Sequence, residues 1–201
     1  MIAPVKHIVF ITGTDTGIGK TLFAVLLLKF WRREGVNAAA LKPVSSGGRD
    51  DARKMFAAME GALSLDEINP WHFRAAIAPL LAARRERKKV RLAQVTAHVR
   101  AMQKRFDALV VEGAGGLLSP LGEDFNSRDL IVALRAMPII IAPNRLGVVN
   151  HVLLTLEALP KKLRAKARVV LMPLRRPDSS AKSNAKLLAE FLDAKQIFSA
   201  D

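Results

Sequence analysis

Short apolar runs alternate along the chain with longer stretches in which apolar positions recur every three or four residues. The short runs have the length of buried strands, and the longer stretches have the spacing of amphipathic helices. Strands are predicted at 6–12, 37–42, 107–112, 138–143 and 168–173. Helices are predicted at 20–34, 50–60, 92–106, 126–136, 148–160 and 179–194. Because strands and helices alternate, the pattern predicts an α/β fold with a parallel sheet flanked by helices in three layers, α/β/α.

Residues 61–91 have the least regular pattern, and no internal repeat, low-complexity segment or linker interrupts the chain. A length of 201 residues is typical of one domain and is sufficient for a substantial core. We therefore expect residues 1–201 to form a single domain. Open α/β sheets bind ligands beyond the carboxyl ends of their strands, so we expect the functional site there.

Composition bears on the compartment in which the protein works. Half of the residues are hydrophobic, which argues against extensive disorder. The chain has no cysteine, which excludes disulfides and thiolate chemistry and is compatible with a reducing compartment. The sequence shows no signal-peptide pattern and no apolar run of membrane-spanning length. We therefore expect a cytoplasmic protein that does not bind a membrane.

A formal net charge of +14 raises the question of nucleic-acid binding. Lysine and arginine cluster at 84–91, 161–168 and 175–176, and such clusters can bind a phosphate backbone. However, the chain has no tyrosine and only 5% aromatic residues, so it offers few side chains on which bases could stack. No helix-turn-helix or zinc-binding pattern is present. A solvated basic surface is therefore favoured over nucleic-acid recognition.

Residues 12–21, Thr-Gly-Thr-Asp-Thr-Gly-Ile-Gly-Lys-Thr, lie between a predicted strand and a predicted helix. In a phosphate-binding loop of this kind, backbone N–H groups at the helix start face the ligand, a lysine reaches the terminal phosphates, and a hydroxyl holds Mg²⁺. Lys20 and Thr21 occupy those two places. The common pattern has a glycine where this chain has Thr14, so the loop is a variant. A purely structural turn is the alternative, but Lys20 and Thr21 in this context favour a phosphate-loop NTPase-like fold.

Two further segments follow strands that should lie near this loop. Lys42 begins Lys-Pro-Val-Ser-Ser-Gly after the second strand, and it would add a cation where charge develops during phosphoryl transfer. Glu112 ends the third strand before Gly-Ala-Gly-Gly, where an acid can hold the Mg²⁺ of ATP and small residues allow close approach. The structural alternatives are a surface lysine and a strand-ending glutamate. The neighbouring phosphate loop favours the functional interpretation.

Together these segments resemble the ATP-dependent dethiobiotin synthetases of biotin biosynthesis. The matching motifs occur in order over roughly three quarters of the chain, at 12–21, 42–47, 112–116 and 146–151. The Asn-Pro-aromatic segment at 69–73, followed by Ala78 and Pro79, also resembles the middle region of that family.

The resemblance implies a ligase that closes the ureido ring of dethiobiotin. In that family 7,8-diaminononanoate takes up CO₂ as a carbamate, ATP phosphorylates the carbamate, and the second amine displaces phosphate. The resemblance thus implies ATP as co-substrate, Mg²⁺ as cofactor and a homodimer. Two lysines and a metal would offset the repulsion between the carbamate and the phosphates.

The resemblance also implies roles for individual residues. The candidate catalytic residues are Lys42, Lys20 and Thr16. The candidate Mg²⁺ ligands are Thr21, Asp51 and Glu112, although Asp50 could replace Asp51 and either aspartate could cap the following helix. Candidate nucleotide-binding residues are Gly17, Ile18, Gly19, Lys20, Thr21, Leu22, Asp51, Glu112, Gly113, Ala114 and Gly115. Candidate substrate-binding residues are Thr16, Lys42, Ser46, Gly147, Val148 and Asn150.

The last three of these begin a predicted helix, whose N-terminus would receive the substrate carboxylate across a dimer interface. Asn150 could instead only cap that helix.

The sequence departs from the family where the nucleotide base should bind. Met172 stands near the position of an asparagine that reads the adenine edge, a later Gly-x-x-Pro segment is absent, and Leu80 replaces a histidine. Two other function classes therefore stay open. One is a related phosphate-loop amidoligase or partition-type ATPase, although the latter usually has an additional lysine early in the loop. The other is a catalytically weakened regulatory relative, which would show salt-sensitive DNA binding.

Overall fold

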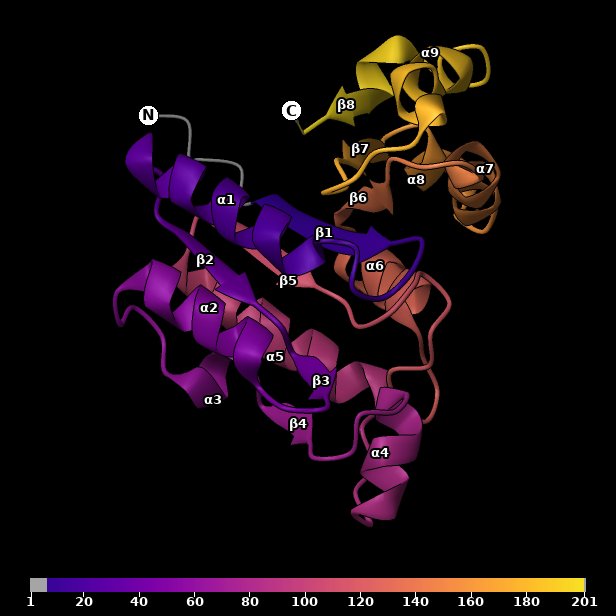
Figure 1. Cartoon of the computed structure of the whole chain (residues 1–201). Coiled ribbons are helices and arrows are strands. Elements are labelled where there is room, and N and C mark those ends of the chain that lie inside the picture. Colours follow the sequence, from indigo (N-terminus) through magenta and orange to yellow (C-terminus); the bar gives the residue numbers. More distant parts are fainter. Residues whose placement is uncertain (1–6, 201) are drawn as a thin grey trace.

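The computed structural model describes residues 7–200, and within them six parallel strands form a central sheet (Figure 1). The strand order is β2-β5-β1-β6-β7-β8, so the strand that precedes the phosphate loop lies inside the sheet. The strands are β1 (His7–Gly13), β2 (Ala38–Leu41), β5 (Ala108–Glu112), β6 (Met137–Pro143), β7 (Arg168–Met172) and β8 (Ile197–Ser199). Residue 6, the first of the predicted N-terminal strand, lies outside the described residues.

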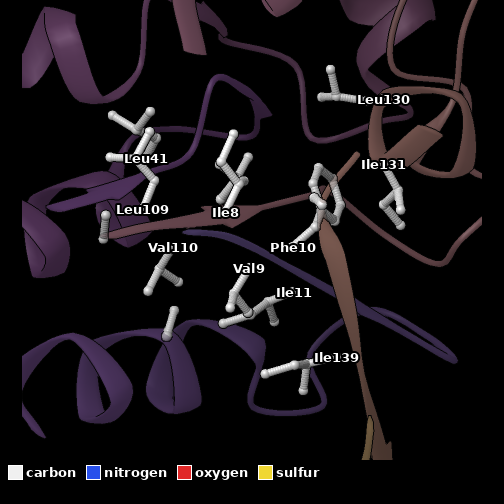
Figure 2. Packing of buried hydrophobic residues seen from close by; sticks show 14 of the residues in the cluster. Ile8, Val9, Phe10, Ile11, Leu41, Leu109, Val110, Leu130, Ile131 and Ile139 are labelled. Carbon is white, nitrogen blue, oxygen red and sulfur yellow. The ribbon is translucent and has the colours of Figure 1, made fainter. Parts of the chain in front are cut away.

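The strands are apolar because both faces of the sheet are covered, as is usual for parallel sheets. Figure 2 shows alternate residues of β1 on opposite faces: Phe10 lies on one side, and Val9 and Ile11 lie on the other. Leu130 of α6 (Ser127–Leu134) lies on the Phe10 side, and α1 (Lys20–Arg33) lies on the Val9 side. Phe10 and Ile11 are fully buried, so they belong to the centre of the core.

The remaining long helices complete the outer layers. The helix α5 (Leu92–Arg105) packs on α6 and β5, whereas α2 (Asp50–Met59) packs on α1 and β2. On the other side of β1, α7 (Val148–Glu157) packs on β6. The three-layer α/β/α arrangement predicted from the sequence is therefore confirmed.

The predicted long elements agree with the structure within three residues at each described end. The prediction of one helix over 179–194 is wrong. That segment contains the short helices η1 (Ser179–Lys182) and α9 (Asn184–Leu188), followed by a turn and η2 (Ala194–Gln196).

Short polar side chains explain why this helix is interrupted. The Asp178 side chain accepts hydrogen bonds from the backbone N–H and hydroxyl of Ser180, at 2.9 and 2.6 Å. The buried Asn184 side chain donates to Asn144 Oδ1 at 2.8 Å. Such side chains compete with the helical backbone for hydrogen bonds. The strand β8 that follows was not predicted.

Short elements also fill the region of weakest pattern. They include α3 (Leu65–Ile68), β4 (Trp71–Phe73) and α4 (Pro79–Arg85), and β4 pairs in parallel with β3 (Val44–Ser46). The helix α8 (Lys161–Arg164) follows α7. Elements of three to seven residues have too few positions to show a clear period, so the sequence pattern did not reveal them. The small β3–β4 sheet matters because it supports the chain just after Lys42.

Among the helices of residues 7–200, none is long and apolar enough to cross a bilayer.

Candidate active site

A cavity of about 840 Å³ lies beyond the carboxyl ends of β1, β2 and β5. The phosphate loop, the segment after β2 and the segment after β5 line it, together with the starts of α2 and α4. Such a volume is typical of small-molecule sites. The three motifs that the sequence singled out therefore meet in one place, as the parallel sheet requires.

The phosphate loop connects β1 to α1 through two glycines with left-handed backbone. Gly17 has φ of +69° and Gly19 has φ of +93°, conformations that glycine adopts without steric strain. Gly19 directly precedes α1, and its carbonyl accepts the first helical hydrogen bond, from Phe23 N at 3.0 Å. Lys20 folds back along the loop, where its Nζ donates to the carbonyl oxygen of Asp15 at 2.5 Å.

Lys42 lies between two carboxylates. Its Nζ is 2.5 Å from Glu112 Oε1 and 2.7 Å from Asp51 Oδ2. Thr21 joins the same group, because its hydroxyl donates to Glu112 Oε1 at 2.9 Å. Lys42 and Glu112 are 5% and 1% exposed, so two opposite charges are buried together. A buried charge requires such a partner, because desolvation is otherwise far too costly.

The two lysines of the cavity have opposite pKa shifts. Burial is the main cause that lowers the pKa of Lys20 to about 8. Burial would also lower the pKa of Lys42, but the charges and hydrogen bonds of Glu112 and Asp51 outweigh it and raise that pKa. Burial would raise the pKa of Asp51, but Lys42 outweighs it and lowers that pKa. Lys42 and Asp51 therefore stay charged at neutral pH, whereas Lys20 lacks an equally strong partner.

The sequence left Asp50 and Asp51 as alternative members of the site. Asp51 contacts Lys42, whereas Asp50 pairs with Arg53 at 2.7 Å on the exposed side of α2. Asp51 is thus the aspartate that faces the buried charges.

The donor set around Glu112 fits a small, hard cation that is completed by other oxygens. Glu112 Oε2 is buried and has no hydrogen-bond partner in the protein. The Thr21 hydroxyl and Asp51 lie on the same side of the cavity, at the start of α1 and α2. Within residues 7–200, no group of three or more His, Asp or Glu could hold a metal without further ligands. Mg²⁺ typically takes one or two carboxylates together with phosphates and water, which matches this arrangement.

A buried asparagine that the sequence interpretation did not assign to the site holds the Lys42 backbone. Asn69 is fully buried, and its side-chain amide donates to the carbonyl of Lys42 at 2.6 Å. Its Oδ1 accepts from the Ser45 hydroxyl at 3.1 Å and from Arg49 Nε at 3.3 Å. The backbone N–H of Lys42 donates to Ile68 O at 3.0 Å. The only sequence signal for this contact was the Asn-Pro-aromatic segment that begins at Asn69.

Most other candidate residues also reach the cavity. Thr16 and Ser46 line it, and the Ser46 hydroxyl donates to Ile77 O at 2.6 Å. The further candidates that line it are Gly17, Ile18, Gly19, Leu22, Ala114 and Gly115. Gly113 does not line the cavity. A Cβ atom on Gly113 would lie 2.5 Å from Ser127 Oγ, so its role in the structure is close packing behind the site.

The candidate residues at the start of α7 are not brought to this cavity within the described chain. Gly147 precedes α7 with φ of +87°, Val148 is buried and Asn150 is exposed. None of the three lines the cavity, and Leu146 beside them is 76% exposed. A single protomer therefore does not bring the start of α7 to its own cavity. The sequence analysis expects that contact across a dimer interface.

Met172 lies beside the phosphate loop at the end of β7. A Cβ atom on Gly19 would lie 3.0 Å from Met172 Cε, so the thioether touches the loop at its last glycine. Nearby, Asn144 N donates to Met172 O at 2.8 Å, and Asn144 Nδ2 donates to Ala181 O at 3.1 Å. The side-chain amides in this region are thus used to hold the chain.

Comparisons with known proteins identify the family of the chain. A family model described as an AAA domain matches residues 7–197. The ATP-dependent dethiobiotin synthetase BioD of Anaeromyxobacter sp. (strain Fw109-5) is 44% identical over 154 residues, which cover 75% of this chain and 69% of that protein. The chain belongs to the ATP-dependent dethiobiotin synthetase family. The family member of Akkermansia muciniphila is 36% identical over 92% of this chain and 87% of its own length.

Among solved structures, a ParA family ATPase from Chlorobium tepidum TLS superposes with a TM-score of 0.57. It covers 96% of this chain and 82% of its own chain at 11% identity. That likeness shows the phosphate-loop NTPase fold alone, so it does not favour the partition-type alternative. Membership of the synthetase family confirms the resemblance that the motifs suggested.

Proposed function

We propose that this protein is a dethiobiotin synthetase, which closes the ureido ring of 7,8-diaminononanoate with CO₂ and ATP. The observation that carries the proposal is the convergence of Lys20, Thr21, Lys42 and Glu112 on one cavity, in a chain of this family. Phosphate chemistry in which two anions meet needs cations close to the reacting groups, and Lys20 and Lys42 supply them.

The reaction has three balanced steps. One amine of the substrate adds to CO₂ and loses a proton, which gives a carbamate. A carbamate oxygen then attacks the γ-phosphorus of ATP, and the bond between that phosphorus and the bridging oxygen breaks to release ADP. Finally, the second amine attacks the carbamoyl carbon and loses a proton, while the carbon–oxygen bond to phosphate breaks.

The two lysines take different parts in this scheme. Lys20 exchanges the carbonyl of Asp15 for oxygens of the β- and γ-phosphates. Lys42 lies beside the carbamate and the γ-phosphate, where negative charge builds up during transfer. Its pairing with Glu112 and Asp51 keeps it protonated and oriented before the substrates arrive.

Thr21, Asp51 and Glu112 are the residues that we assign to Mg²⁺, which would neutralise phosphate charge when bound. The unpartnered Glu112 Oε2 supports that assignment. The loop residues Gly17, Ile18, Gly19 and Leu22 would surround the phosphates through their backbone, and Ala114 and Gly115 would leave room for the nucleotide.

We assign Thr16 and Ser46 to the reacting end of the substrate, because both line the cavity. The carboxylate of the substrate would bind at Gly147, Val148 and Asn150 of a second protomer. The proposal of a homodimer agrees with the exposure of Leu22, which lines the cavity, and of Leu146, which precedes Gly147; they are 56% and 76% exposed. We also propose that the protein works in the cytoplasm, where ATP is available, and that the chain folds as a single domain.

Mass spectrometry of the product tests the proposal. The protein is incubated with diaminononanoate, bicarbonate, Mg²⁺ and ATP, with ATP omitted or Lys42 replaced by glutamine as controls. We expect a ring-closed product that needs ATP and falls steeply in Lys42→Gln. ATP hydrolysis without ring closure would contradict the proposal.

A further inference from the structure

A second cavity, of about 780 Å³, opens at the opposite edge of the central sheet. It lies at the amino ends of β1, β6 and β7, where those strands begin with His7, Met137 and Arg168. The end of α6 and the segment from α8 to β7 form its other walls. We call it the amino-edge hollow. It shares no residue with the candidate active site, which lies beyond the other ends of the strands.

The charged side chains of the amino-edge hollow are all basic. They are Arg135, Lys162, Lys166 and Arg168, and no aspartate or glutamate lines the hollow. Among residues 7–200, none of the four makes an ion pair within 4.0 Å. Arg168 Nη1 donates to the backbone carbonyls of Lys166 and Ala167, at 3.3 and 3.4 Å. Within the described part of the chain, four cations thus share one concave surface without a carboxylate partner.

Two acidic residues lie near the elements that form the hollow, and neither belongs to its lining. Glu157 pairs with Arg164, which is also outside the lining. Asp107 precedes β5 beside His7, but it is not among the lining residues. Among residues 7–200, no lining carboxylate therefore neutralises the positive charge of the hollow.

The backbone of Arg135 offers a way to remove one of the four cations cleanly. Arg135 ends α6 with φ of +52°, a left-handed conformation in which glycine is the usual residue. Glu60 and Arg87 have the same conformation outside the hollow, so it is a helix-end geometry and not a mark of the hollow. A glycine at position 135 would therefore remove the charge and keep the backbone conformation.

We propose that the amino-edge hollow binds a small molecule that carries two or more phosphate groups. Its volume matches a ligand of nucleotide size or less. Arginine donates hydrogen bonds in pairs to phosphate oxygens, and lysine adds point charges. A nucleic acid fits less well, because the lining has no phenylalanine, tryptophan or tyrosine on which bases could stack and the surface is concave.

Tripolyphosphate binding, measured by titration calorimetry, tests this site. Because the phosphate loop also attracts tripolyphosphate, all measurements use Lys20→Ala as the background. Arg135→Gly removes one cation and also relieves the left-handed backbone, so it should not lower the unfolding temperature. Arg87→Gly is the matched control, since Arg87 is exposed, has φ of +54° and lies outside the hollow.

We expect Arg135→Gly to weaken tripolyphosphate binding about tenfold, as the loss of one charge-assisted hydrogen bond implies. Lys162→Met should weaken it in the same direction, and Arg87→Gly should leave it within about twofold. Equal effects of Arg135→Gly and Arg87→Gly, or no effect of either, would overturn the proposal, because the anion would then respond to net charge alone. The proposal would also be overturned if a short DNA duplex displaced tripolyphosphate and lost the same affinity in Arg135→Gly.

Discussion

Basic side chains line a cavity at both edges of the central sheet, but the surroundings of these charges differ. At the carboxyl edge, Lys42 is buried and has two carboxylates within 2.7 Å. At the amino edge, none of the basic side chains that line the hollow forms an ion pair with a carboxylate of residues 7–200. Burial explains the contrast, since a charge can leave water only when other charges or dipoles replace its hydration.

The two edges can therefore use their cations in different ways. The carboxyl edge holds its groups in fixed positions before any ligand binds, which suits the stabilisation of charge that develops during a reaction. The amino edge leaves its cations hydrated and unpaired, which suits an anion that arrives with its full charge. Substitutions at the carboxyl edge should therefore affect turnover most.

The largest effect is expected from the phosphate loop. Lys20→Ala and Thr21→Ala would remove the proposed phosphate contact and the proposed metal ligand, and each should lose on the order of 3 kcal/mol of transition-state stabilisation. ADP release at saturating substrate measures the loss. Lys29→Ala is the control for Lys20→Ala, because Lys29 is exposed on the same helix. Unchanged turnover in both loop variants would reject the phosphate-loop assignment.

Lys42→Gln should separate catalysis from nucleotide binding. If the lysine acts mainly on the charge that builds up in transfer, kcat should fall about 100-fold, or roughly 2.7 kcal/mol, with little change in the Kd of ATP. Steady-state kinetics and calorimetry give the two values. Equal losses in kcat and in affinity would instead make Lys42 a ground-state binding residue.

Asn69→Ala sharpens the comparison within the carboxyl edge. The buried carbonyl of Lys42 would lose its amide partner, so the free energy of unfolding should fall by about 1–3 kcal/mol. Turnover should fall as well, with the KM of ATP nearly unchanged, because the lost hydrogen bonds hold Lys42, Ser45 and Arg49 and none of them reaches the phosphate loop. Denaturant unfolding and kinetics measure the two effects.

Asn184→Ala is the matched control, because Asn184 is also a buried, hydrogen-bonded asparagine but lies in the segment near Asn144. It should lose similar stability and retain turnover. If both variants lost turnover in proportion to their stability, Asn69 would have only a structural part.

The smallest effect concerns the nucleotide base. Met172 stands where a base-reading asparagine was expected, and the amides of Asn144 and Asn184 bond to the protein. ATP should therefore be preferred over GTP or CTP by less than about tenfold, or roughly 1.4 kcal/mol. Ring closure at subsaturating concentrations of each nucleotide measures this preference. A preference above about a hundredfold would show that other groups read the adenine.

The sequence predicted which motifs meet at the carboxyl ends of the strands, and the reason is physical. Their residues follow long buried strands, and in a parallel sheet the ends of neighbouring strands must meet. Thus Lys42 and Glu112, which are 70 positions apart, could be brought together from the pattern alone. The choice between Asp50 and Asp51 needed coordinates, because both begin the same helix.

The regions that the sequence did not predict depend on tertiary hydrogen bonds. Asn184 interrupts the expected helix through its bond to Asn144, 40 positions away, and no local pattern reveals that partner. In the same way, the hydrogen bond from the Asn69 side chain to the Lys42 carbonyl joins residues 27 positions apart. The amino-edge hollow required the fold as well, because Arg135 and Lys162 belong to different elements.

Transfer of oxygen from CO₂ to phosphate tests the central claim most directly. The protein is given diaminononanoate, Mg²⁺ and ATP with ¹⁸O-labelled CO₂, and the phosphate released with the ring-closed product is analysed by mass spectrometry after a short incubation. Because a carbamate oxygen attacks the γ-phosphorus and leaves with it, each phosphate should carry one oxygen from CO₂. Ring closure that releases unlabelled phosphate, with the CO₂ pool still labelled, would contradict phosphoryl transfer to a carbamate at this site.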